Sequence, residues 1–74
     1  MTTTRKPLSG RIAEARKAKG LSMYAAAKIA GIPEGSWRAV ERDGVEPHLF
    51  RAAAIAEVLG VSIDWLAGRT ESAD

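Results

Sequence analysis

The sequence has no cysteine among its 74 residues and only one histidine, His48. Without cysteine, a disulfide framework and a thiolate metal site are both excluded. His48 has no second histidine at ligand spacing, so we expect no metal ion and no cofactor. The sequence also shows no nucleophile–base arrangement and no phosphate-binding glycine loop, so an enzyme is not expected.

Long hydrophobic runs are absent as well. No apolar stretch approaches the roughly 18 residues that a membrane span needs, and no segment resembles a signal peptide. We therefore expect a soluble cytoplasmic protein with no membrane partner and no small-molecule ligand. A chain of 74 residues accommodates a single domain with one small core.

The charge is divided unevenly along the chain. The net charge is +2, but residues 1–42 carry +6 and residues 43–74 carry −4. Such a division is typical of a protein that faces a polyanion at one end. A solvated surface with a chance asymmetry explains it equally well.

The spacing of apolar residues predicts five short helices and no strand, an all-α fold. We expect helices over residues 8–18, 23–30, 34–42, 47–59 and 63–67, which end at glycines or at the Asp43–Gly44 turn. The compact domain then spans residues 8–68. Residues 1–7, with Arg5 and Lys6, are expected to form a flexible basic arm, and residues 69–74 a frayed tail.

The same spacing predicts which side chains face the core. The expected core residues, in chain order, are Leu8, Ile12, Ala15, Ala26, Ile29, Ala30, Trp37, Val40, Leu49, Ala52, Ile55, Ala56 and Leu59. In the last helix, Ile63 and Leu66 are expected to face inward, which leaves Trp65 partly exposed.

One spacing is more informative than the others. Ala27 is followed four residues later by Gly31, and Trp37 and Val40 come six and nine residues after that glycine. This is the layout of a helix-turn-helix. A small residue lets the next helix cross closely, and glycine adopts the left-handed conformation of the turn. The two apolar anchors leave the opposite face of the second helix free for a DNA groove.

The chain resembles the Cro and phage-repressor (XRE-type) helix-turn-helix domains over nearly its whole length. The resemblance is carried by "RIAEARKAKGLS" at 11–22, Ala27 with Gly31, "VERDG" at 40–44, Pro47, and "IAEVLGVSIDWLAG" at 55–68. It implies a compact five-helix, lambda-repressor-like fold. It also implies that the helix over residues 34–42 enters the major groove of a near-palindromic double-stranded operator, which the protein binds as a homodimer.

The resemblance implies roles for particular residues as well. The expected base readers lie in the first turns of the recognition helix: Glu34, Gly35, Ser36, Arg38 and Ala39. The expected phosphate contacts are Ser22, Met23, Lys28, Arg42 and Arg11. The expected dimer interface comprises Phe50, Ile63, Trp65 and Leu66. Structural roles are expected for Arg16, Ala27, Gly31, Trp37, Val40 and Glu41, with Arg16 and Glu41 paired between the first and third helices.

Some positions depart from the family's usual pattern. Met23 stands where a phosphate-contacting glutamine is common, and Asp43 and Glu46 stand in a loop that is commonly basic. Ala39 occupies a position that sometimes reads a base. The chain is therefore expected to make fewer DNA contacts than a typical member.

Trp37 stands where the family usually has isoleucine or valine, while Ala26 and Ala52 stand where leucine is common. A large residue that faces small ones conserves the volume of a core. The indole N–H then needs a carbonyl or a water molecule as its acceptor. The alternative, an exposed base-stacking Trp37, fits the spacing poorly.

The sequence thus favours a sequence-specific DNA-binding transcriptional regulator, most simply a small Cro-like repressor of a phage or prokaryote. Two alternatives stay open. One is an antitoxin or restriction–modification controller of the same fold, and the other is a helix-turn-helix scaffold that binds a protein partner instead of DNA. The length favours a build like that of Cro, without an effector-binding or self-cleaving domain, but it also suits the DNA-binding part of a longer protein.

Overall fold

The computed structural model describes residues 8–69, which contain five α-helices and no strand. The helices are α1 (Leu8–Ala18), α2 (Met23–Ala30), α3 (Glu34–Asp43), α4 (Leu49–Leu59) and α5 (Ile63–Leu66). The predicted all-α fold is confirmed. The predicted N-terminal arm, and the tail beyond residue 69, lie outside the described residues.

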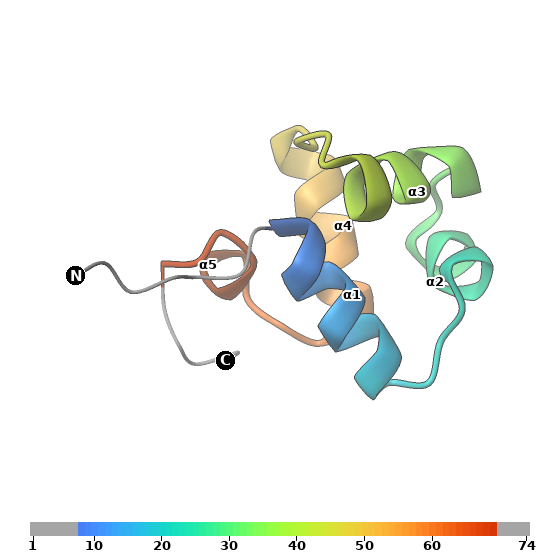
Figure 1. Cartoon of the computed structure of the whole chain (residues 1–74), viewed down its shortest axis with the longest axis horizontal. Coiled ribbons are helices and arrows are strands. Elements are labelled where there is room, and N and C mark those ends of the chain that lie inside the picture. The colour runs from blue at the N-terminus through green and yellow to red at the C-terminus, as the bar shows by residue number, and fades with distance from the viewer. Residues whose placement is uncertain (1–7, 70–74) are drawn as a thin grey trace.

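The helices are arranged around α1 and α4. Helix α3 packs against α1 and α2, α2 also packs against α4, and α5 contacts both α1 and α4. Figure 1 shows α2 and α5 on opposite sides of this assembly, with α3 across the end where α4 begins. One long side of α3 therefore faces the other helices, and the other long side faces solvent.

The core draws buried side chains from every helix. Its buried apolar members are Ile12, Ala15, Ala26, Ala27, Trp37, Val40, Ile55, Ala56, Leu59 and Leu66. Trp37 is the largest side chain that is fully buried. Its predicted place in the core is confirmed, and the alternative of an exposed, base-stacking tryptophan is wrong.

Three residues predicted to face the core are exposed instead. Ile29 is 64% exposed because α2 turns Ala26 and Ala27 toward the core. Leu49 is 66% exposed because it is the first residue of α4 and precedes the buried part of that helix. Ile63 is 38% exposed because the single turn of α5 directs Leu66 into the core.

Helix α4 begins two residues later than predicted, because His48 rather than Pro47 defines its start. His48 has an extended backbone conformation, and its ring Nδ1 accepts a hydrogen bond from the Arg51 N–H at 3.2 Å. This side chain thus serves one of the N–H groups that the first turn of a helix leaves unpaired. The lone histidine of the chain is a helix cap.

Candidate nucleic-acid interface

The turn between α2 and α3 is built as the spacing predicted. Gly31 has a φ of 76°, in the left-handed region that favours glycine. Its N–H donates to the Lys28 carbonyl at 3.2 Å, and the Ile32 N–H donates to the Ala27 carbonyl at 3.0 Å. Pro33, with a φ of −61°, then leads the chain into α3. The turn is held by its own backbone, so it fixes the direction in which α3 leaves α2.

Two anchors set the rotation of α3 about its own axis. Trp37 and Val40 are buried, at 0% and 3% exposure, as predicted. The indole N–H of Trp37 donates to Oε1 of Glu41 at 2.8 Å. The acceptor is therefore a carboxylate, and neither of the two predicted acceptors, a carbonyl or a water molecule, is the one found.

Glu41 also ties α3 to α1. Arg16 donates from Nε to Oε1 of Glu41 at 2.8 Å and from Nη2 to Oε2 at 2.7 Å. Its third nitrogen, Nη1, donates to the Leu21 carbonyl at 2.7 Å. The predicted ion pair between the first and third helices is thus present. Its two-bond geometry is the most directional that a carboxylate and a guanidinium form.

The surroundings of this pair shift the pKa of both groups. Burial acts to raise the pKa of Glu41, but the hydrogen bonds from Arg16 and Trp37, with the charges of Arg16 and Lys17, outweigh it and hold the pKa below its ordinary value. The hydrogen bond to Glu41 raises the pKa of Arg16, against the opposite effect of burial. Both groups therefore stay ionised at neutral pH and keep the two helices tied.

Of the predicted base readers, Gly35, Arg38 and Ala39 lie on the side of α3 turned away from these anchors, whereas Glu34 and Ser36 lie at the edges of that side. Gly35 and Arg38 are exposed, and Glu34, Ser36 and Ala39 are half-buried. Arg42, a predicted phosphate contact, is exposed on the same helix. A Cβ atom added to Gly35 would meet no atom within 4 Å beyond its chain neighbours and the backbone of its own helix. Gly35 thus leaves part of the outer side of α3 without a side chain, and the exposed arginines lie next to this part.

Two of the predicted readers are bonded to each other. Arg38 Nη2 donates to Glu34 Oε2 at 2.7 Å, and the two side chains are 48% and 38% exposed. They stand four residues apart, the spacing that places side chains on one helix face. Ion pairs this exposed contribute about 0–1 kcal/mol to stability, so the pair can rearrange at little cost when a ligand approaches.

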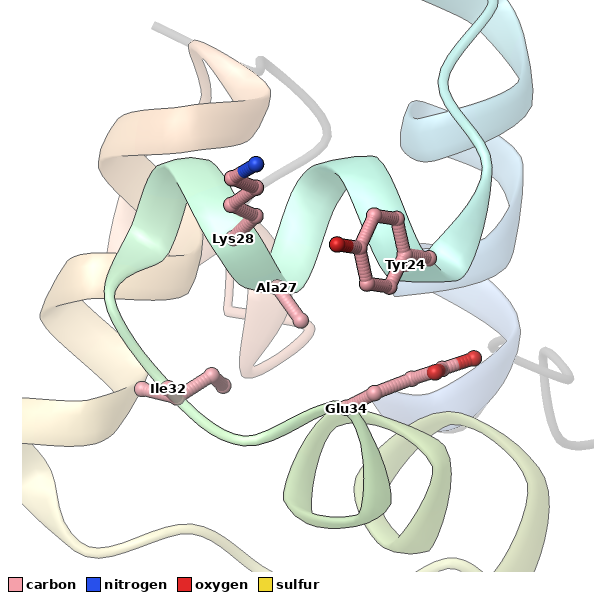
Figure 2. Close-up of a pocket in the computed structure, with 5 residues that line it drawn as sticks. All are labelled: Tyr24, Ala27, Lys28, Ile32 and Glu34. Carbon is pink, nitrogen blue, oxygen red and sulfur yellow. The ribbon is translucent and has the colours of Figure 1, made fainter.

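Helix α2 supplies the neighbouring wall of a shallow groove of about 220 Å³, lined by Tyr24, Ala27, Lys28, Ile32 and Glu34. In Figure 2, Tyr24 lies across from Glu34 at one end of the groove and Ile32 lies at the other. The Lys28 ammonium lies 5.9 Å from the centroid of the Tyr24 ring, a cation–π contact. Lys28 is exposed, as a phosphate contact requires.

Tyr24 is a candidate contact residue that the sequence analysis missed. It is 58% exposed and borders the same groove as Glu34. The four-residue spacing between Tyr24 and Lys28 could have indicated this role, since residues four apart share one helix face. A phenol at this place offers a hydroxyl to a phosphate or base edge.

Arg11 was predicted to contact phosphate, and this prediction is wrong. Its side chain is buried, at 6% exposure, and its Nη1 donates to the Trp65 carbonyl at 2.9 Å. Its guanidinium carbon lies 5.0 Å from the centroid of the Trp65 ring. Arg11 shares a helix face with Ile12 and Ala15, and this periodicity was the sign of its inward position. It joins α1 to α5.

The two predicted phosphate contacts at the start of α2 have other roles in this structure. The Ser22 hydroxyl accepts a hydrogen bond from the Ala25 N–H at 3.0 Å, so it caps the helix. The Met23 side chain packs against the core. What this helix end offers to a phosphate is its free backbone N–H groups and their partial positive charge.

The four predicted dimer residues are divided between surface and core. Phe50 is 81% exposed and Ile63 is exposed, whereas Trp65 is half-buried under Arg11. Leu66 is 2% exposed and belongs to the core of its own chain. Its assignment to a dimer interface is therefore corrected. Two further apolar side chains, Val45 and Leu49, are exposed close to Phe50 in the sequence.

Among residues 8–69, no three histidine, cysteine or acidic side chains gather as metal ligands would. None of the helices in this range has the length and apolar character needed to cross a membrane.

The chain is similar to one protein family in the region that forms the helices. A helix-turn-helix family model (HTH_3) matches residues 12–66, from α1 to the end of α5. A comparison with curated proteins finds no match. Because the family model covers most of the chain, the chain belongs to the XRE-type helix-turn-helix family of DNA-binding transcription regulators.

Proposed function

We propose that the protein is a sequence-specific DNA-binding repressor of the Cro type, with α3 as the recognition helix in the major groove. The observation that carries this proposal is the orientation of α3. Trp37, Val40 and Glu41 occupy its inner side, and Arg38 and Arg42 are exposed on the helix. A helix held in this way offers its polar side to a groove without rearrangement of the fold.

Each exposed group on this side has a contact that suits its chemistry. Arginine is the usual two-bond reader of guanine, so Arg38 is the main base reader, with Ser36 as a second one. Arg42 on α3 and Lys28 on α2 are both exposed, and we assign them to phosphate contacts. Gly35 leaves open space beside the helix, which allows the backbone to approach the DNA closely.

The repressor is proposed to act as a homodimer on an operator, in the cytoplasm of a bacterial host cell. Of the residues assigned to this contact, Phe50 and Ile63 are exposed, and large exposed apolar side chains commonly mark interaction surfaces. Two recognition helices would then lie about 34 Å apart, one turn of DNA. Occupation of promoter DNA by such a dimer excludes other proteins from it.

A second function is favoured by one observation. Val45, Leu49 and Phe50 are all more than half exposed, in a segment that also carries Asp43 and Glu46. Acidic and apolar groups together suit a protein partner better than a phosphate backbone. In that case the helix-turn-helix scaffold binds a protein instead of DNA.

Selection of bound sequences from a random pool of duplexes distinguishes the two. We expect a near-palindromic sequence to be enriched, with an affinity that falls by about 0.9 log units per phosphate contact for each log unit of salt. Lys28→Ala should flatten this slope by about one unit. Lys19→Ala is the matched control, because Lys19 lies beside Gly60 at the end of α4, away from α3. If no sequence is enriched, the protein-binding function replaces this one.

A further inference from the structure

Glu34 and Arg38 form one unit on the exposed side of α3. The guanidinium of Arg38 donates from Nη2 to Oε2 of Glu34 at 2.7 Å. Lys28, which lines the groove with Glu34, lies over the ring of Tyr24. Because an exposed pair contributes little to stability, either member can be replaced without loss of the fold.

The pair keeps most of its capacity to bond. A guanidinium has five N–H donors and a carboxylate has two acceptor oxygens. The contact between Arg38 and Glu34 uses one donor and one oxygen. The exposed side of α3 therefore presents several donors and an acceptor at a single point.

These groups match the edges of particular bases. Two donors of an arginine fit O6 and N7 of guanine, while a glutamate accepts from the N4 amino group of cytosine. Neighbouring base pairs are about 3.4 Å apart, and the two bonded atoms of the pair are 2.7 Å apart. When the pair stays bonded on DNA, both edges therefore belong to one base pair or to two adjacent ones.

We propose that Glu34 and Arg38 read DNA together and specify a guanine with a cytosine amino group in the same or the adjacent base pair. The proposal rests on the proposed function, since it requires α3 in the major groove. Arg38 supplies the attraction. Glu34 provides the selectivity between sequences. The phosphates repel its carboxylate on any DNA, and only a base that offers a hydrogen-bond donor offsets this repulsion.

Two substitutions at one position test this division of roles. Glu34→Gln replaces the carboxylate by an amide, and amides pair with N6 and N7 of adenine. In a random-pool selection, its preference should change from cytosine to adenine where the cytosine lies in the adjacent base pair, and should weaken without a change of base where the cytosine is the partner of the guanine that Arg38 reads. Glu34→Ala should lose the preference there, with discrimination reduced about 5- to 150-fold, and should bind scrambled duplexes more tightly than the wild-type protein does.

Glu57→Gln is the matched control. It also removes one negative charge, but Glu57 is exposed on α4, where it lines the groove with Ile29 and Val58. It should leave the selected sequence unchanged. Thermal unfolding of all three variants should stay close to that of the wild-type protein, which shows that a change in selection does not arise from a loss of fold.

The possible failures are distinguishable. If the wild-type protein enriches a sequence, and both Glu34 variants enrich the same one with equal discrimination, the pair is a surface ion pair only. The present proposal is then overturned while DNA binding stands. If the wild-type protein enriches no sequence at any salt concentration, the proposed function fails and this proposal fails with it.

Discussion

The indole N–H of Trp37 and the carboxylate of Glu41 meet at 2.8 Å, one turn apart on α3. The oxygen that accepts from Trp37 also accepts from Nε of Arg16 on α1. One carboxylate thus satisfies the buried polar group of the largest core side chain and holds two helices together. In this way the core fixes which side of α3 is turned toward solvent.

Removal of this carboxylate should destabilise the protein strongly. Glu41→Ala leaves the Trp37 N–H and the Arg16 guanidinium without their acceptor, and loss of one partner of a buried pair costs about 3–5 kcal/mol. Glu41→Gln keeps one oxygen for both donors and should cost about 1–2 kcal/mol. Urea titration followed by tryptophan fluorescence measures both. Equal stability of Glu41→Ala and the wild-type protein would contradict the role of Glu41.

The same pair gives a pH dependence of defined sign. Because the pKa of Glu41 in the folded protein is lower than its ordinary value of 4.5, its contribution to stability is complete above that value. It should be lost as the pH falls through the pKa of the folded state. Thermal melts should be recorded between pH 3 and 7, a range of about four units around the ordinary glutamate pKa. As the pH falls, the melting temperature of Glu41→Gln should decrease less than that of the wild-type protein. Parallel curves for the two proteins would refute this assignment.

Substitution by alanine should have opposite effects on protein stability at Gly35 and at Gly31. A Cβ on Gly35 has open space, so Gly35→Ala should stabilise the free protein by about 0.5–1 kcal/mol. Gly31 has a φ of 76°, and Gly31→Ala should destabilise it by about 1–2 kcal/mol. If the backbone of α3 approaches DNA at Gly35, the stabilised variant binds all duplexes more weakly. Unimpaired binding by Gly35→Ala would mean that the DNA does not approach α3 at this residue.

Association should depend on Phe50. Because this side chain is 81% exposed, Phe50→Ser leaves the core intact. If it is a central contact of the dimer, its loss should weaken dimerisation by about 2 kcal/mol or more. Ile29→Ser, also at an exposed apolar residue, is the control. Sedimentation with and without operator-length duplex measures both variants. A wild-type protein that stays monomeric in each condition would argue against the homodimer.

The sequence was sufficient to predict the helices and the turn, because those depend on local rules. Ala27 and Gly31 meet the steric needs of a tight crossing and a left-handed turn, and the structure shows both. The inward position of Trp37 followed from its helical spacing. These predictions needed only the periodicity of a helix and the conformational range of glycine.

The errors arose where a long side chain or a helix end decides the outcome. Arg11 is charged, so it was assigned to DNA, but it is buried, where it stacks on Trp65 and donates to the Trp65 carbonyl. Leu49 fits the helical period, yet it lies at the end of α4, where no neighbouring helix covers it. The bond between Glu34 and Arg38 depends on rotamers, which a sequence does not specify.

The central claim, that α3 reads DNA, is tested most directly by titration of Arg38→Ala against the selected duplex and a scrambled one at several salt concentrations. Arg38→Ala should lose about 1–3 kcal/mol on the selected duplex and relax specificity at one base position. Lys28→Ala should weaken both duplexes alike, with a flatter salt dependence. If neither substitution changes binding to either duplex, α3 is not the reading element and the account is contradicted.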